Sequence, residues 1–345
     1  MRPLVTQSLR RAEEIPCMII CSGTSRLVVI GGEFLPPPGE QRNQLLLDLM
    51  HGKPQGLGGE SSQNNKVSVV TSQRARQAFQ FHFYQVVPQT GQLFDQMECS
   101  NAAAAAGLFA RLSRVARPRT GSTLIETTNT ATGQHIVLSI PAEGEMWKQP
   151  WGIRFELPTA VAAKYQLCRQ ATQLGLEDGR LIDCHIIKHG NVFAFCQLPP
   201  EEMTEALALE LSHKVIERAV ELARAEAPFL PKVIPYAQME PHQFRTASYF
   251  EGERHSSMPG SAGMALGLLA RIVLEIPGRD YEIYCGPRHQ ELMRVQVGEN
   301  NSYTQFETPV RLLLHGAAPV PPQHSFFLEP PEEATSTETP SRSGA

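Results

Sequence analysis

Short runs of apolar residues, many alternating with polar ones, dominate the chain and predict a protein built mainly from β-strands. The runs are bounded by Gly, Pro, Asn and Ser, which is typical of strands joined by turns. Helices are predicted at residues 41–50, 102–115 and 199–227, and in a small-residue stretch that follows His255. Strands are predicted within residues 15–32, 67–70, 79–87, 91–96, 122–128, 135–140, 153–157, 181–187, 232–236, 244–250, 282–285, 292–297 and 310–315.

The helix predicted at residues 102–115 stands out because its first two turns carry no charge on any face. Such a helix is typically surrounded by protein. It follows a polar turn in which Asn101 or Ser100 can cap the first free N–H groups. Cys99 is therefore expected at the positive end of a buried helix, where N–H groups and the helix dipole stabilise a thiolate. A thiol placed there can exchange protons, although the position also suits a small buried cap residue.

The same pattern occurs a second time in the chain. Gly-Leu-Phe-Ala-Arg-Leu at residues 107–112 aligns with Gly-Leu-Leu-Ala-Arg-Ile at residues 267–272, an offset of 160 residues (267 minus 107). At this offset Cys99 faces Pro259, so the second copy has no thiol at that position. The spacing predicts two similar halves, each built on one central helix of small residues.

Composition and charge suggest a protein that binds neither nucleic acid nor membrane. The 345 residues correspond to about two domains. The formal net charge is −4 and the acidic and basic residues are interspersed, so we expect no basic face for nucleic acid. No apolar run reaches the roughly 18 residues that span a bilayer, and the N-terminus lacks the apolar core of a secretory signal. We therefore expect a cytoplasmic protein.

The spacing of the cysteines and histidines suggests no metal site. The seven cysteines show no paired CxxC spacing, and we expect them to be reduced thiols. The eleven histidines include no HExxH and no zinc-finger combination with Cys, so no metal site is predicted. Pro, Glu, Ser and Thr dominate the last part of the chain, and we expect residues 319–345 to be a disordered tail.

Two polar loops contain further candidate binding groups. The turn Ser22-Gly23-Thr24-Ser25 would present backbone N–H groups and three hydroxyls together, as a carboxylate cradle does, although an ordinary hairpin turn looks the same. The glycine-rich loop at residues 56–66 lacks the order of a phosphate loop and ends in Lys66 at the start of an apolar strand. A lysine held between apolar neighbours can exchange protons, whereas a solvated strand-edge lysine would not.

The motifs follow one another in a fixed order along the chain. They are Ser22-Gly23-Thr24-Ser25-Arg26, Gly56-Leu57-Gly58-Gly59 ending in Asn65-Lys66-Val67, Cys99-Ser100-Asn101, Thr128-Asn129-Thr130-Ala131-Thr132-Gly133, Gly190-Asn191-Val192 and Gly260-Ser261-Ala262-Gly263. In their order and spacing, over roughly residues 15–300, the chain resembles the 2-methylaconitate cis-trans isomerase family of the PrpF type, relatives of diaminopimelate epimerase.

The chain departs from the family pattern around the expected substrate cradle. Cys21 stands where the family has arginine, Arg26 where it has lysine, Ser100 where it has glycine and Val192 where it has proline. A Gly-His-Pro-Ser-Gly segment expected near residues 285–289 is also replaced. The cysteine and the lysine of the family's acid–base pair are both present. We therefore interpret the chain as a divergent member, whose substrate need not be methylaconitate.

The resemblance implies a fold of the α+β class. It predicts two similar domains, each an antiparallel barrel-like sheet wrapped around a central helix, with the active site between them. We place the N-terminal domain at residues 1–180, the C-terminal domain at residues 181–318 and the tail at residues 319–345. The resemblance leaves a homodimer open.

The resemblance also implies an enzyme, a cofactor-independent isomerase that moves a proton on an unsaturated di- or tricarboxylic acid of the aconitate or methylaconitate kind. It assigns the acid–base roles to Lys66 and Cys99 without deciding which group is the base. Alternatives are an isomerase or tautomerase of a specialised or amino-acid-derived metabolite, and a binding protein without catalysis. The residues expected to bind the small carboxylic acid are Ser22, Gly23, Thr24, Ser25, Gly59, Ser62, Asn64, Asn65, Ser100, Asn101, Gly260 and Ser261.

Overall fold

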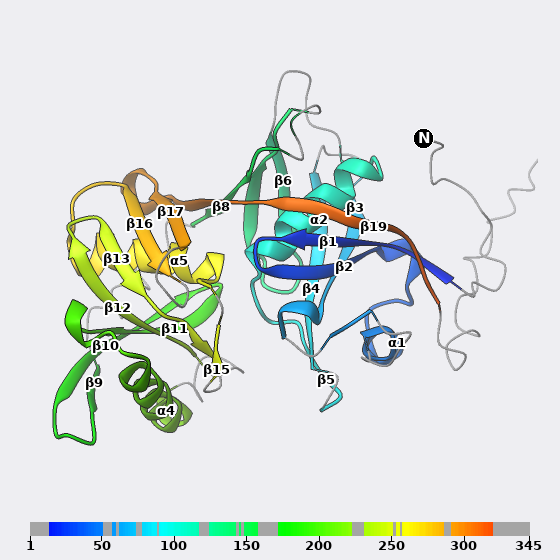
Figure 1. Ribbon diagram of the computed structural model, residues 1–345. Helices are drawn as coiled ribbons and strands as arrows, with labels where there is room; N and C mark the ends of the chain where they lie inside the picture. Colours follow the sequence, from blue (N-terminus) through cyan, green and yellow to red (C-terminus); the bar gives the residue numbers. More distant parts are fainter. Residues whose placement is uncertain are drawn as a thin grey trace, which may run out of the picture.

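The fold was analysed in a computed structural model of the chain (Figure 1). The structure describes residues 14–50, 57–59, 62–73, 78–87, 90–116, 124–142, 145, 148–157, 172–222, 231–250, 253–255, 257–285 and 291–319. Of the predicted tail, only Pro319 is described, and it ends the last strand. Residues 320–345 lie outside the described residues, so the disordered tail stays a prediction.

Strands are the commonest element of the described chain, as the apolar pattern predicted. In chain order they are β1 (Glu14–Ser22), β2 (Ser25–Gly31), β3 (Lys66–Ser72), β4 (Ala78–Val87), β5 (Gln92–Phe94), β6 (Leu124–Asn129), β7 (His135–Ser139), β8 (Trp151–Glu156), β9 (Thr172–Gly175), β10 (Leu181–His189), β11 (Asn191–Gln197), β12 (Lys232–Glu240), β13 (Gln243–Thr246), β14 (Tyr249–Phe250), β15 (Glu253–Arg254), β16 (Asp280–Cys285), β17 (Glu291–Val297), β18 (Tyr303–Thr308) and β19 (Val310–Pro319).

The α-helices of the described residues include all four that the sequence predicted. They are α1 (Glu40–Met50), α2 (Ser100–Leu112), α4 (Glu205–Leu222) and α5 (Gly260–Leu268), the last of which continues as a π-helical turn, Leu269–Val273. Short 3₁₀ turns are η1 (Gly32–Phe34), η2 (Ser62–Asn64), η4 (Pro200–Glu202) and η7 (Glu299–Asn301). Within the described ranges, no helix is both long enough and apolar enough to cross a membrane.

The chain folds into two halves whose strands pair in the same sequence of steps. In the first half β1–β2 is antiparallel, β2–β3 parallel, β3–β4 antiparallel and β4–β6 parallel. In the second half β10–β11, β11–β12, β12–β13 and β13–β16 repeat these four relations. Antiparallel strands then close each half, β6 to β8 in the first and β16 to β18 in the second. The two similar halves predicted from the repeat are thus present.

The two halves exchange their last strands. β9 follows β8 of the first half in the chain, but it pairs with β10 of the second half. β19 follows β18 of the second half and returns to pair with β1 of the first, as the long orange strand in Figure 1 shows. β8 and β18 also pair with each other. The sequence analysis expected residues 172–175 in the first domain and residues 310–318 in the second, whereas these pairings put each strand in the other half's sheet.

Each half is wrapped around its central helix. Residues 100–110 of α2 are all buried, and this helix contacts β1, β2, β3, β4, β6, β7, β8 and β19. Every residue of α5 is buried as well, against β10, β11, β16, β17 and β18. Such close wrapping requires small side chains, because a Cβ added to Gly107 would lie 2.4 Å from the Cδ1 atom of Leu138. The α+β fold of two sheets, each around one central helix, is the predicted one.

The two central helices meet at their N-termini. A Cβ added to Gly260, the first residue of α5, would lie 2.6 Å from the Ser100 Oγ atom at the first residue of α2. It would also lie 2.2 Å from the Cζ atom of Phe306. A glycine is therefore needed at this point, because any side chain would force the two helices apart. The positive ends of both helix dipoles consequently face one region between the halves.

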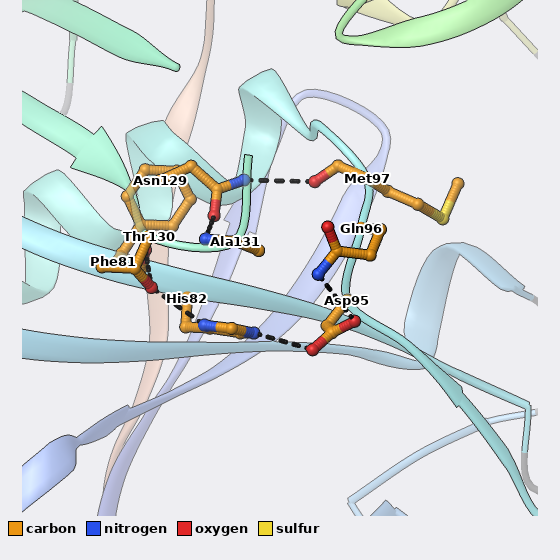
Figure 2. A network of polar contacts seen from close by, with 8 residues as sticks. All are labelled: Phe81, His82, Asp95, Gln96, Met97, Asn129, Thr130 and Ala131. Carbon is orange, nitrogen blue, oxygen red and sulfur yellow. Dashed lines mark hydrogen bonds and ion pairs between the residues drawn. The ribbon is translucent and has the colours of Figure 1, made fainter. Parts of the chain in front are cut away.

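Polar contacts hold the turn that leads into α2 (Figure 2). The Asn129 Nδ2 atom donates to the carbonyl oxygen of Met97 at 3.1 Å, and the Ala131 N–H donates to Asn129 Oδ1 at 3.2 Å. On the other side of the turn, His82 lies 2.8 Å from Thr130 Oγ1 and 3.2 Å from Asp95 Oδ2. The hairpin between β6 and β7 thus fixes the approach to the helix.

Glu98, the residue before Cys99, is buried where the two halves join. The Asn191 side chain accepts from the Glu98 N–H at 3.2 Å and donates to its carbonyl oxygen at 2.8 Å. The Glu98 carboxyl accepts from the Thr132 hydroxyl, and its second oxygen, Oε2, has no hydrogen-bond partner among the described residues. Burial raises the pKa of Glu98 to about 8, against a smaller lowering by Asn129. The carboxyl is therefore protonated at neutral pH.

This buried carboxyl predicts a pH-dependent stability. In the unfolded chain Glu98 ionises near its ordinary pKa of 4.5, whereas in the folded chain it keeps its proton up to about pH 8. The wild type should therefore lose stability as pH rises between these values, by on the order of a few kcal/mol. Glutamine has nearly the same shape as glutamic acid but does not ionise, so Glu98→Gln should remove this loss of stability. Chemical unfolding at pH 5.5 and pH 8 measures the difference, with the exposed Glu307→Gln as control. Parallel pH profiles for wild type and Glu98→Gln would contradict the assignment.

Candidate functional site

A short chain of hydrogen bonds connects Lys66 to the first turn of α2. The Lys66 Nζ atom donates to Ser25 Oγ at 2.8 Å, and Asn101 Nδ2 donates to the same oxygen at 3.1 Å. Lys66 begins β3 and Ser25 begins β2, two parallel strands in which Lys66 lies opposite Leu27. The hydroxyl, the ammonium and the amide therefore come from three separate elements and meet at one point.

Cys99 occupies the N-cap position of α2. Its backbone is extended, with φ −140° and ψ 103°, and its thiol makes no capping hydrogen bond to the helix. The side chain is half-buried. The N–H groups of the first helical turn have no intrahelical acceptor, so they face the same region as the thiol. This arrangement suits an anion, or a substrate on which negative charge develops.

The second half contributes the N-terminus of α5 to the same region. Pro259 is the N-cap, and its carbonyl oxygen accepts from the N–H groups of Ala262 and Gly263 at 2.9 and 3.0 Å. Asn191 connects the two helices, because its Nδ2 atom donates to Glu98 O and lies 3.5 Å from Ser261 Oγ. Both helix N-termini are thus held in one place by a single amide side chain.

The glycine-rich loop is fastened to the body of the first half. The Arg26 guanidinium donates to the carbonyl oxygens of Leu57 and Gly58 at 2.7 and 3.2 Å. The Asn65 side chain accepts from the Gly59 N–H at 2.8 Å and donates to its carbonyl oxygen at 2.7 Å. Both side chains therefore position the loop that ends in Lys66 and are occupied by backbone partners.

Two residues of the second half complete the surroundings of Lys66. The His255 Nδ1 atom lies 3.4 Å from Gln63 Nε2 in η2, a contact between the halves. Burial and the positive charges of Lys232 and Lys66 lower the pKa of His255 to about 3, so its ring is neutral. Burial and the charge of Lys66 lower the pKa of Lys232 to about 8, against an opposing effect of Cys99. Among the described residues, no cluster of three His, Cys, Asp or Glu side chains could hold a metal ion.

The predicted binding residues divide into two groups. Those that gather with Lys66 and Cys99 around the two helix N-termini are Ser25, Ser100, Asn101, Gly260 and Ser261.

The remaining predicted residues support the site or lie beside it. Gly23 has a φ of +52°, and a Cβ on it would meet Asn101 Oδ1 at 2.7 Å, so it allows the turn to pass close to α2. Thr24 is exposed at the same turn. Ser22 is fully buried, which closes its hydroxyl to a ligand in this structure. Asn64 and Asn65 lie against Gly59 in the loop, and the Ser62 side chain is outside the described residues.

Sequence reasoning missed several residues of the site. Asn191 had been noted only as part of the Gly-Asn-Val motif, and neither Gln63 nor His255 had a signal of its own. Lys232 did have one, because it opens a predicted apolar strand as Lys66 does. The sequence does not show which of the predicted strands begin close to one another. Only the pairing of strands in the folded structure decides this.

Comparison with known proteins finds related sequences for part of the chain. Residues 12–173 match the sequence model of the family described as PrpF protein. A segment of 139 residues is 32% identical to the 4-oxalomesaconate tautomerase of Pseudomonas putida. This alignment covers 38% of the chain and 38% of that relative's own length. The sequence likeness therefore lies in part of the chain.

Solved structures extend the likeness to nearly the whole chain. A methylitaconate-delta-isomerase superposes with a TM-score of 0.67 at 17% identity, covering 90% of this chain and 97% of that one. A hydroxyproline epimerase from Agrobacterium vitis superposes with a TM-score of 0.57 at 14% identity, covering 92% and 96%. At such identities the likeness concerns the fold alone. Over residues 12–173, just under half of the chain, the sequence thus matches the PrpF family model, and the fold of the described residues is the one seen in these solved structures.

Proposed function

We propose that the chain is an isomerase that moves a proton on an unsaturated di- or tricarboxylic acid, of the aconitate or methylaconitate kind, and that it needs no cofactor. The observation that carries the proposal is the convergence of Lys66 and Cys99 on the N-terminal turn of α2, opposite the N-terminus of α5. A lysine and a thiol from different elements supply two groups that exchange protons, beside N–H groups that favour negative charge.

The chemistry needs one base and one acid. A C–H next to a conjugated carboxylate is acidic, because the negative charge left behind spreads onto the carboxylate oxygens. The base, either the Lys66 amine or the Cys99 thiolate, takes that proton and leaves a dienolate. The other group returns a proton to a different carbon, and the double bond moves. The helix N-termini stabilise the charge on the dienolate oxygens, as fixed donors do in an oxyanion hole.

The names of similar proteins support this reaction class. One relative is named a 4-oxalomesaconate tautomerase and one structural neighbour a methylitaconate-delta-isomerase. Both names describe an isomerisation of an unsaturated acid. The substitutions at Cys21, Arg26 and Ser100 favour a substrate that differs from methylaconitate.

Proton exchange with solvent tests the proposal directly. In heavy water, wild-type enzyme incubated with trans-aconitate or mesaconate should introduce deuterium at an allylic carbon, because the abstracted proton mixes with solvent. Proton NMR of the recovered acid follows the exchange. A heat-denatured sample is the control for uncatalysed exchange. A panel of unsaturated di- and tricarboxylic acids that bind without any exchange would identify a binding protein instead.

The thiol of Cys99 should be essential. Cys99→Ser should fold normally and lose about 10²- to 10⁴-fold in kcat, because a serine hydroxyl is too weakly acidic to replace the thiol in proton transfer. Steady-state kinetics on the best exchanging acid measures the loss. Cys17→Ser, in an apolar cluster away from the helix N-termini, controls for the general effect of removing a thiol. Near-wild-type turnover by Cys99→Ser would remove the thiol from the mechanism.

Lys66→Arg separates proton transfer from charge neutralisation. If the amine transfers a proton, the arginine variant should lose about 10²-fold or more in kcat, because guanidinium does not deprotonate near neutral pH. Its KM should change little. Lys148→Arg makes the same substitution at an exposed lysine outside the site and serves as the control. An arginine variant that keeps kcat and changes only KM would assign Lys66 to binding alone.

A further inference from the structure

Lys232 occupies in the second half the place that Lys66 occupies in the first. Lys66 is the first residue of β3, which runs parallel to β2 with Lys66 opposite Leu27. Lys232 is the first residue of β12, which runs parallel to β11 with Lys232 opposite Phe193. Each of these strands next pairs antiparallel with β4 or β13, and a central helix follows in the chain. Each half of the repeat therefore has a lysine at the start of the equivalent strand.

The pairing of the strands brings this second lysine to the junction of the halves. β11 begins at Asn191, whose amide is bonded to Glu98 beside Cys99. On its other side, β12 pairs with β14, which pairs with β15, and His255 follows directly. His255 contacts Gln63, three residues before Lys66. The strand that Lys232 begins thus lies between β11, which reaches the first half through Asn191, and the β14–β15 pair, after which His255 reaches it.

The charges around Lys232 agree with this placement. Burial and the ammonium of Lys66 lower the pKa of the half-buried Lys232, and Cys99 opposes this lowering. His255 is neutral and leaves the positive charge to the two lysines. Two ammonium groups in one partly buried region repel each other, and an anion with several carboxylates relieves that repulsion.

We propose that Lys232 binds a substrate carboxylate on the opposite side of the junction of the halves from Lys66 and thereby selects acids with three carboxylates over acids with two. This inference rests on the proposed function, since it concerns the same substrate. The second half has proline at the N-cap where the first half has Cys99, so it adds a lysine and no second thiol. The added positive charge suits recognition of a carboxylate through a charge-assisted hydrogen bond.

Binding of two probe acids to lysine variants tests the role. The probes are trans-aconitate, with three carboxylates, and mesaconate, with two. Lys232→Met should weaken the binding of trans-aconitate about 10- to 100-fold, measured as Kd by calorimetry, which is the usual loss for a charged hydrogen bond. The binding of mesaconate should weaken by a smaller factor. Lys232→Arg keeps the charge and should stay within a few-fold of wild type. In the kinetics, Lys232→Met should raise KM more than it lowers kcat.

Controls separate this role from folding and from the proposed reaction. Thermal unfolding verifies that both Lys232 variants fold, and the exposed Lys148→Met provides the same substitution outside the site. Unchanged Kd values for both acids in folded Lys232→Met would overturn the inference, as would an equal loss for the two acids. If Lys232→Met and Lys232→Arg both lost kcat but kept a normal Kd, Lys232 would act in proton transfer and not in recognition of the substrate. Wild type that binds the whole panel of unsaturated acids without deuterium exchange would refute the isomerase, while the Kd comparison would still decide the role of Lys232.

Discussion

The close approach of two helix N-termini is the constraint on which the rest of the structure depends. Ser100 and Gly260 begin α2 and α5 almost in contact, so no side chain fits on Gly260. Two helix dipoles that point their positive ends at one region repel each other until an anion lies between them. The surrounding sheets hold this arrangement, because both helices are buried along their length and made of small residues. Helix N-termini arranged in this way favour a bound anion.

The exchange of last strands explains how the two halves keep this approach. β9 and β19 each leave one half and complete the sheet of the other, and β8 pairs with β18 between them. A hinge between the halves would have to break these ladders. Asn191 adds a local connection, because one side chain bonds the backbone before α2 and reaches the first turn of α5. Groups from the two halves can therefore be placed opposite each other with little loss of precision.

Each half of the repeat has a lysine at the same strand position, but only the first half has a thiol at the helix N-cap. Lys66 and Lys232 begin equivalent strands, whereas the N-cap residues are Cys99 in one half and Pro259 in the other. A site with equivalent thiols on both faces would suit exchange of a proton between the two faces of one carbon. One thiol with two lysines instead suits a proton moved between carbons of a highly charged acid. The duplicated fold thus provides a lysine at the start of the equivalent strand twice and a thiol at the helix N-cap once.

Much of this could be predicted from the sequence, because the decisive signals are local. The uncharged first turns of α2, the turn before it and the repeat at residues 267–272 predicted two buried helices and placed Cys99 at an N-terminus. Lys66 at the start of a strand was read in the same way. The equivalence of Lys66 and Lys232 could not be found from the sequence repeat, because segments of different length separate the two lysines from their helices. Lys66 precedes Cys99 by 33 residues (99 minus 66), and Lys232 precedes Pro259 by 27 (259 minus 232). Only the strand pairing aligns the two lysines.

The exchange of β9 and β19 and the burial of Glu98 likewise depend on contacts between residues distant in the chain, which no local pattern of apolar and polar positions encodes.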